Sequence, residues 1–214
     1  MNLCTCPAAS ALTTIPAAGC PESFGQIQKI AFVRLAKSNG TKNGFSTTAK
    51  ITLKASWTAL MAAVDGSKVV ISPYIQAPSQ EAGSPRTFGG GNETLGGVEM
   101  VIGREPSTFT GVIRSVSQSV IKAMKALQCE AQADNLGVYL FDENGAIEAV
   151  KGSGADDYSP IPIRSLFIGD KAHGGLEAPD SNAIQFTFLP NYSDDLAIVV
   201  PTDFNPLTDL IPAT

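Results

Sequence analysis

The amino-acid sequence predicts a mainly β fold, an α+β chain in which one or two helices flank a β-sandwich or barrel. Gly and Pro, 20 and 14 residues respectively, are spread through turns between short apolar segments, as in an all-β domain. Residues 184–188 alternate apolar and polar side chains, which is the period of a half-buried strand. Only two segments, 56–64 and 115–128, repeat apolar residues at the three- and four-residue spacing of an amphipathic helix.

The composition narrows the class of protein. At 214 residues the chain is long enough to bury a sizeable core as one large domain. Charged residues make up only 16% of it, below the average of soluble proteins, which favours a surface that is partly covered by other subunits. The net charge of −5 argues against a nucleic-acid-binding surface, which needs clustered Lys and Arg. No apolar run reaches the length of about 18 residues that a membrane-spanning helix needs.

Residues 1–21 are rich in Ala, Thr, Pro and Cys without periodicity, and we expect them to form an extended N-terminal arm. No basic region precedes the apolar residues, so a signal peptide is not indicated. Cys4, Cys6 and Cys20 lie in this segment and Cys129 lies at the end of a predicted helix, a distribution unlike a disulfide framework that favours a reducing compartment. Because Cys-x-Cys is a poor spacing for zinc, no metal site is predicted.

Residues 115–150 are expected to form the centre of the fold, an α-helix followed by a β-hairpin. Ser115 and Gln118 have the spacing of a capping box, which predicts that the helix begins at Ser115. Asp134-Asn135 interrupts the helical pattern, and Asn144-Gly145 is typical of a type I′ turn between two strands. The apolar stripe of this helix consists of Val116, Val120, Ile121, Met124 and Leu127, and its polar face of Gln118, Lys122, Lys125 and Gln128.

The residues before that segment predict further elements. A strand over 26–35 has apolar side chains on both faces, so we expect it to lie between two layers. A turn-rich loop follows at 37–44, then a short helix with Ser56 as its cap, then a strand over 68–75 that the Ser72-Pro73 break ends. Trp57, the only Trp, is interpreted as a core or interface anchor. The buried face of the short helix is expected to contain Trp57, Leu60, Met61 and Val64.

Residues 76–97 are the most loop-like part of the chain, with two prolines and two runs of glycine. A loop of this length in a compact domain usually serves binding or assembly. The expected organisation is an N-terminal arm over 1–21, a single β-rich domain over 22–203 that carries this loop, and a C-terminal tail over 204–214. Further strands are expected at 98–102, 107–113, 163–168, 184–188 and 196–200.

Several patterns resemble chemical sites, and each has a simpler explanation. Gly89–Gly97 lacks the Lys-Ser/Thr or the following helix that a phosphate-binding loop requires. Ser119-x-x-Lys122 matches the Ser-x-x-Lys of acyl enzymes, whose other elements are absent from the sequence. His173, the only histidine, has no recognisable nucleophile or orienting carboxylate in the sequence around it.

Two acidic pairs, Asp156-Asp157 and Asp194-Asp195, lack the spaced oxygen ligands of a calcium loop and are interpreted as turn residues. The sequence therefore predicts no catalytic residue, no cofactor-binding residue and no metal ligand. The chain is not expected to be an enzyme.

Five stretches together suggest a family. They are Gln28–Arg34, Phe88–Gly97, Leu136–Phe141, Gln185–Tyr192 and Asp203–Pro206. Their pattern resembles that of the major tail (tail tube) proteins of long-tailed bacteriophages, in particular those of phages and prophages of Bacteroides-type bacteria. The resemblance extends from about Gln26 to Pro206 and leaves out the Cys-bearing N-terminal segment.

The resemblance implies a ring-forming, tail-tube-like architecture. The chain would be a structural virion protein that self-assembles into stacked hexameric rings, forming the conduit for genome delivery. Its partners would be other copies of itself and tail proteins such as the tape measure and the terminator, and DNA would pass through without sequence-specific binding. No membrane insertion is implied. The protein would lie in the virion tail after assembly in the host cytoplasm, with 76–97 as the loop that reaches a neighbouring subunit or ring.

Other assignments remain open from the sequence. A tail terminator, a connector component or a capsid decoration protein would share the β architecture, but a terminator or connector would stop at one ring instead of forming an indefinite stack. From a different class, a small-molecule- or glycan-binding β-domain, or a hydrolase that uses His173, is the alternative.

Overall fold

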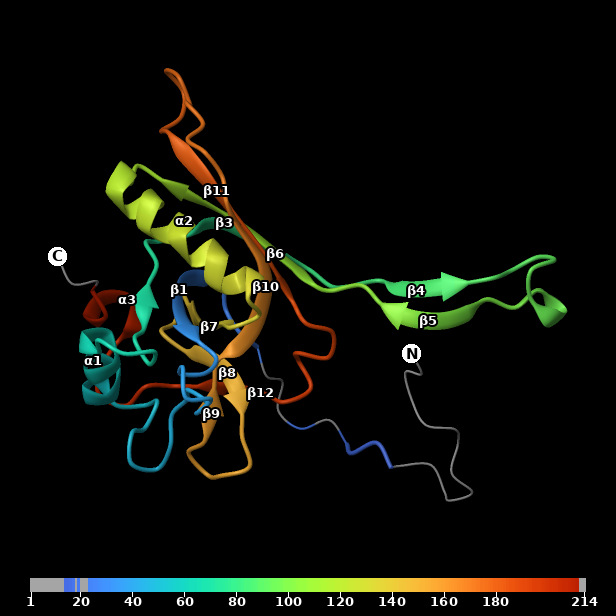
Figure 1. Ribbon diagram of the computed structural model, residues 1–214, viewed down its shortest axis with the longest axis horizontal. Helices are drawn as coiled ribbons and strands as arrows, with labels where there is room; N and C mark the ends of the chain where they lie inside the picture. The colour runs from blue at the N-terminus through green and yellow to red at the C-terminus, as the bar shows by residue number, and fades with distance from the viewer. Residues whose placement is uncertain (1–13, 18, 20–22, 212–214) are drawn as a thin grey trace.

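The computed structural model describes residues 14–17, 19 and 23–211. It confirms a mainly β chain with an antiparallel, sandwich-like arrangement of strands, and Figure 1 shows this body together with a two-stranded arm that projects from it. The strands of the body are β1 (Ile27–Arg34), β2 (Val70–Ile71), β3 (Gln76–Glu81), β6 (Thr108–Arg114), β7 (Leu136–Asp142), β8 (Ile147–Lys151), β9 (Tyr158–Ser159), β10 (Ile161–Ile168), β11 (Ser181–Phe188) and β12 (Leu196–Val199). The helices are α1 (Lys54–Ala62), α2 (Gln118–Gln132) and α3 (Pro206–Asp209).

The strands β1 and β7 form the centre of the body and pair antiparallel along nearly their whole length. Successive side chains of β1 point to opposite faces. Ile30 and Phe32 pack into one apolar cluster, and Ala31 and Val33 pack into a second cluster on the other face. The prediction of a strand buried between two layers is therefore confirmed.

The main sheet branches at β7. Its strand order is β12-β8-β7-β10-β11-β6-β3. The strand β1 pairs with β7 along the edge that β8 and β10 leave free. One edge of β7 is shared, since β8 pairs with it at Phe141 and β10 pairs with it at Val138. The β10–β11–β6–β3 limb and α2 enclose the first cluster, whereas α1, β8 and the C-terminal residues contribute to the second.

Trp57 anchors the second cluster. The side chain is fully buried, its indole nitrogen donates a hydrogen bond of 2.8 Å to the Ile51 carbonyl, and its ring centroid lies 4.7 Å from that of Phe45. Tyr139 packs edge-on against it at 5.3 Å. The interpretation of this residue as a core anchor is confirmed.

The helix α2 begins three residues later than the capping-box pattern predicts. Ser115 has a φ of 54° and donates its backbone N–H to the Asp180 carbonyl at 3.1 Å, so it belongs to the turn that leaves β6. Ser117 occupies the N-cap position without a side-chain capping bond. The predicted stripe is confirmed, because Ile121 and Met124 are buried and Val116, Val120 and Leu127 pack against the same cluster.

The β7–β8 hairpin is present, but its turn is not type I′. Gly145 has a positive φ of 80° and Asn144 does not, and the Gly145 N–H donates to the Asp142 carbonyl at 3.1 Å. The buried Asp142 carboxylate accepts hydrogen bonds from the backbone N–H groups of Asn144 (3.0 Å) and Ala146 (2.7 Å). The Asp142 side chain therefore stabilises a turn in which Gly145 adopts the left-handed region and Asn144 does not.

Two predicted boundaries in the first third are wrong. Ser56 lies inside α1, whose first N–H, on Lys54, is instead accepted by the distant Asp203 carboxylate at 2.9 Å. Val64 lies beyond the end of α1 and is fully exposed. The strand expected over 68–75 is shorter than predicted and consists of β2 alone. It ends before Ser72-Pro73, the break that the sequence indicates, because Pro73 has no N–H to continue the ladder.

The residues predicted as a C-terminal tail are docked on the body up to residue 211. Asn205 caps α3 by accepting from the Leu207 N–H at 2.9 Å, and Leu210 is only 1% exposed. The Lys29 ammonium donates to the Leu207 carbonyl at 2.7 Å, which joins α3 to β1. The sequence did not predict this third helix because its apolar residues are too few to show a period.

Candidate functional site: a projecting arm and an apolar groove

The residues expected to form a long loop, 76–97, instead form β3, which pairs with β6, and then the first strand and the tip of a β-hairpin. We call residues 84–105 the arm, which consists of β4 (Pro85–Phe88), a tip with one 3-10 turn (Leu95–Gly97) and β5 (Met100–Arg104). Figure 1 shows the arm extending away from the body to the right of the view. The loop prediction was wrong because β4 has no apolar alternation of its own, and its strand geometry comes from pairing with β5.

The root of the arm is held by close backbone contacts. The Glu105 N–H donates to the Ser84 carbonyl at 2.8 Å. A Cβ atom on Gly83 would lie 1.8 Å from the Glu105 carbonyl oxygen, so the two chains approach as closely as they do only because this residue is glycine. The Arg104 guanidinium donates to the Asn191 side-chain oxygen at 2.6 Å, which ties the arm to the turn after β11.

Thr94 organises the tip of the arm. Its hydroxyl accepts from the Gly90 N–H at 3.1 Å and donates to the Val98 carbonyl at 2.7 Å, while its carbonyl accepts from the Gly97 N–H at 3.0 Å. The tip glycines with positive φ are Gly89, Gly90, Gly91, Gly96 and Gly97. The glycine runs thus serve the connection between β4 and β5.

Apolar side chains cover both faces of the arm. Met100, Val101 and Ile102 are consecutive residues and are 58%, 54% and 49% exposed, because neither face of this ribbon is packed against another layer of the described chain. The other large apolar residues exposed on the arm are Phe88, Leu95 and Val98. A two-stranded ribbon by itself is marginally stable in water, and contiguous exposed apolar surface marks interaction sites. The arm is therefore suited to bind a surface.

The sheet of the body also has open edges. In the part of the chain that the structure describes, β3 pairs only with β6 and β12 pairs only with β8. Each of these strands presents backbone N–H and C=O groups on its outer side, and such edges pair readily with another chain unless they are covered.

A groove lies between α2 and residues 70–76, the segment that runs from β2 to the start of β3. It has a volume of about 650 Å³, and we call it the α2 groove. Its walls are apolar, with Val70 on one side and Val116, Val120 and Leu127 on the other. The residues that line it include two cations, Lys29 and Arg114, and no Asp or Glu.

The two cations of the α2 groove are partly removed from water. The Arg114 Nε atom is buried and has no hydrogen-bond partner among the described residues. Lys29 is 7% exposed, its ammonium lies 4.4 Å from the centroid of the Tyr74 ring, and burial lowers its pKa. Positive charge in such a setting favours an anionic group that arrives together with apolar surface.

A half-buried carboxyl lies close to the side chains that pack beside β3. Glu148 lines a cavity of about 270 Å³ that also contacts Gln80 and Tyr192, whose side chains hydrogen-bond to each other. Burial raises the pKa of Glu148 to about 7. The sequence did not indicate this residue, because a single Glu in a strand looks solvent-facing until the partner strands are known.

The sequence patterns that resemble catalytic sites do not come together. His173 is on the surface with a 79% exposed side chain, and its Nδ1 atom lies 3.2 Å from Asp180 Oδ1, a carboxylate partner that the sequence did not reveal. Ser119 is an exposed residue of α2, and its hydroxyl hydrogen-bonds to that of Ser117 at 2.8 Å. The cavities that Ser119 lines do not include His173 among their lining residues.

The possible metal ligands are likewise dispersed where they can be described. Cys4, Cys6 and Cys20 lie outside the described residues, and Cys129 is an exposed free thiol on α2. Asp156 forms an ion pair with Lys50 at 3.2 Å. Within residues 14–17, 19 and 23–211, no three His, Cys, Asp or Glu side chains are grouped so as to hold a metal ion, and no helix is long and apolar enough to cross a membrane.

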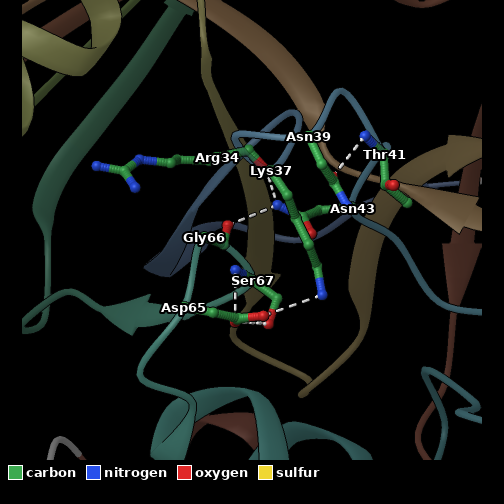
Figure 2. Close-up of polar contacts among 8 residues, drawn as sticks. All are labelled: Arg34, Lys37, Asn39, Thr41, Asn43, Asp65, Gly66 and Ser67. Atoms are coloured by element: carbon green, nitrogen blue, oxygen red, sulfur yellow. Dashed lines mark hydrogen bonds and ion pairs between the residues drawn. The ribbon is translucent and has the colours of Figure 1, made fainter.

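The polar cluster in Figure 2 joins two loops at the end of the body. The buried Asn43 amide donates to the Arg34 carbonyl at 2.9 Å and to the Gly66 carbonyl at 2.7 Å. Hydrogen bonds from Ser67, and the Lys37 ammonium at 3.1 Å, lower the pKa of Asp65 to about 2. These bonds hold the two loops together, while the Arg34 guanidinium points out of the cluster and pairs with Glu130.

Comparison with known proteins gives only distant similarities. No protein-family model and no curated protein matches the chain. Among solved structures, it is similar to a chain in the tail of an empty GTA particle with C6 symmetry, at 11% identity and a TM-score of 0.32 over 60% of this chain and 82% of that one. It is also similar to a chain in the six-fold symmetrised baseplate of the anti-feeding prophage, at 9% identity and a TM-score of 0.34 over 88% of this chain and 98% of that one. Both TM-scores are too low to assign a function, which has to come from the geometry of the chain itself.

Proposed function

We propose that this chain is a structural subunit of a phage-type tail, which assembles with copies of itself into stacked hexameric rings that form a tail tube. The observation that carries the proposal is the arm. Met100, Val101 and Ile102 are exposed on a projecting ribbon with no layer of the described chain on either face. Such a surface is suited to packing against another molecule.

Self-assembly is the mode of binding that the rest of the molecule favours. The outer edges of β3 and β12 are open, and contacts between unlike patches of identical subunits can cover two such edges at once. These contacts give a closed ring when a whole number of subunits completes one full turn. The low content of charged residues, 16%, agrees with a surface that is partly buried between subunits.

The sequence resemblance supplies the proposed setting. The stretches Gln28–Arg34 and Phe88–Gly97 resemble tail tube proteins, and the second of them lies at the end of β4 and the tip of the arm. On this proposal the protein is located in the virion tail and contacts the tape measure and the terminator. The net charge of −5 suits a conduit, because like charge removes the counterion-release drive for DNA to bind its wall.

The test is to remove the arm without disturbing the body. Residues 85–104 are replaced by Asn-Gly, which joins Ser84 to Glu105 through a tight turn, since these two residues are already hydrogen-bonded at 2.8 Å. We expect wild-type protein to form rings and tubes as its concentration rises, by sedimentation velocity and negative-stain microscopy. The shortened variant should stay monomeric and should still unfold in one cooperative thermal transition, which shows that the body folds without the arm.

Three results would contradict the proposal or redirect it. Wild-type protein that remains a monomer at every concentration would refute self-assembly. Normal tubes from the shortened variant would refute the role of the arm. Single wild-type rings that never stack would favour a terminator or connector over a tube subunit.

A further inference from the structure

We infer that the α2 groove of one copy receives the outer part of the arm of a neighbouring copy. The inference depends on the proposed self-assembly and names the surface of the second copy that the arm uses. The outer part of the arm is defined as residues 87–103, and the occupant of the groove is thus a second copy of this chain.

The two surfaces match in polarity. The groove has apolar walls formed by side chains such as Val70, Val120 and Leu127, which face water in the isolated chain. The outer arm presents Val98, Met100 and Val101, which are all more than half exposed. Burying both surfaces against each other removes apolar area from water on each side.

The two surfaces also match in charge. Residues 87–103 contain two acids, Glu93 and Glu99, both exposed, and no Lys or Arg. The groove contains Lys29 and Arg114 and no acid. A carboxylate entering the groove is attracted by these two cations, and the buried Arg114 Nε atom has no hydrogen-bond partner in the described chain that would offset its positive charge. Without such a group, that buried donor carries an uncompensated desolvation cost.

The geometry requires the arm to come from another copy. In Figure 1, α2, which borders the groove, runs across the upper left part of the body, and the arm extends to the right. The strand β4, Pro85–Phe88, spans about 10 Å at about 3.3 Å per residue and the tip extends beyond it, so the tip lies well outside its own body in Figure 1. A contact that joins an arm to a different patch is heterologous, and repetition of it gives either a closed ring or an open filament.

The groove can be blocked at an exposed position with a matched control. Ala123 lines the groove and Ala126, on the next turn of α2, does not, and both are exposed. Ala123→Glu places a bulky negative charge where the acidic arm would dock, while Ala126→Glu makes the same chemical change outside the groove. We expect Ala123→Glu to raise the protein concentration for half-assembly by about tenfold, the order of effect of like charges across an interface, and Ala126→Glu to leave it within about twofold.

A charge-reversed arm identifies the partner of the groove. Glu93→Lys combined with Glu99→Lys should also weaken assembly, because the arm then faces Lys29 and Arg114. When these arm changes are combined with Ala123→Glu, the loss should be smaller than the product of the separate losses, as for residues in direct contact. Thermal melts of each variant check folding, and Ser119→Glu on the same wall of the groove replaces Ala123→Glu if that variant is unstable.

The outcomes separate the two proposals. Three results would each overturn the docking site and leave self-assembly standing. Ala123→Glu could assemble as well as wild type, or Ala123→Glu and Ala126→Glu could lose assembly equally. The third result is a loss in the combined variant that equals the product of the separate losses. Wild-type protein that never assembles would overturn both.

Discussion

Glu148 should make the stability of this protein depend on pH near neutrality. Burial raises the pKa of its carboxyl from 4.5 to about 7 in the folded chain. The folded state therefore binds the proton more tightly than the unfolded state does. The stability that the neutral carboxyl contributes is complete below pH 4.5 and is lost as the pH rises through about 7.

The size of the effect follows from the shift in pKa. At about 1.36 kcal/mol per pKa unit, the cost of ionising Glu148 in the folded state has an upper limit of about 3 kcal/mol. The carboxyl is partly exposed, so solvent screening reduces the expected cost to about 1–2 kcal/mol. Glu148→Gln keeps the shape of the side chain and removes the charge, and it should raise the free energy of unfolding at pH 9 by this amount.

Urea denaturation of both proteins at pH 5, 7 and 9 measures the prediction. The difference in the free energy of unfolding between Glu148→Gln and wild type should increase with pH, with most of the change between pH 4.5 and about 7, the ordinary and the folded-state pKa of Glu148. Glu143→Gln, at the exposed turn of the same hairpin, is the control for removing one carboxylate from this part of the chain. Parallel pH profiles for wild type and Glu148→Gln would refute the reasoning.

Two further substitutions test the body of the fold. Trp57→Ala should lower the free energy of unfolding by about 3–5 kcal/mol, since it empties a fully buried site packed against Tyr139; a loss under about 1 kcal/mol in urea melts would contradict this. Gly145→Ala should lower the free energy of unfolding by more than about 1 kcal/mol, which is the cost of placing Ala in the left-handed region. The added Cβ would also lie 3.1 Å from the Asn205 side-chain oxygen. Gly175→Ala has a similar φ of 69° with no atom within 4 Å, so it should be the milder of the two by thermal denaturation.

Much of the body could be predicted because its signals are local. The stripe of α2 and the alternation in β11 are periods that a few neighbouring residues establish, and burial on one face enforces them. The two-sided burial of β1 was equally readable, since Ile30 and Ala31 are both apolar and point in opposite directions. The prediction that Trp57 is a core or interface anchor followed from the size of its side chain.

The candidate site was less predictable because distant partners create it. The arm exists as a ribbon because β4 pairs with β5 across a glycine-rich tip, and no pattern within β4 reveals that pairing. The α2 groove brings Lys29 of β1 next to Arg114 of β6, two cations that are 85 positions apart in the chain. The carboxylate beside His173 was missed for the same reason, as Asp180 returns to it through the pairing of Ala172 with Ser181.

The sequence by itself determined the mainly β class, the amphipathic α2 and the expectation that residues 76–97 serve assembly. Only the tertiary structure decided that these residues form a projecting hairpin, that α1 is capped by Asp203, and that the C-terminal segment folds onto β1. The physical reason is the range of the forces involved. Side-chain periodicity is set by the nearest turn or pleat, whereas strand partners, remote caps and the desolvation of Glu148 depend on residues that only folding brings together.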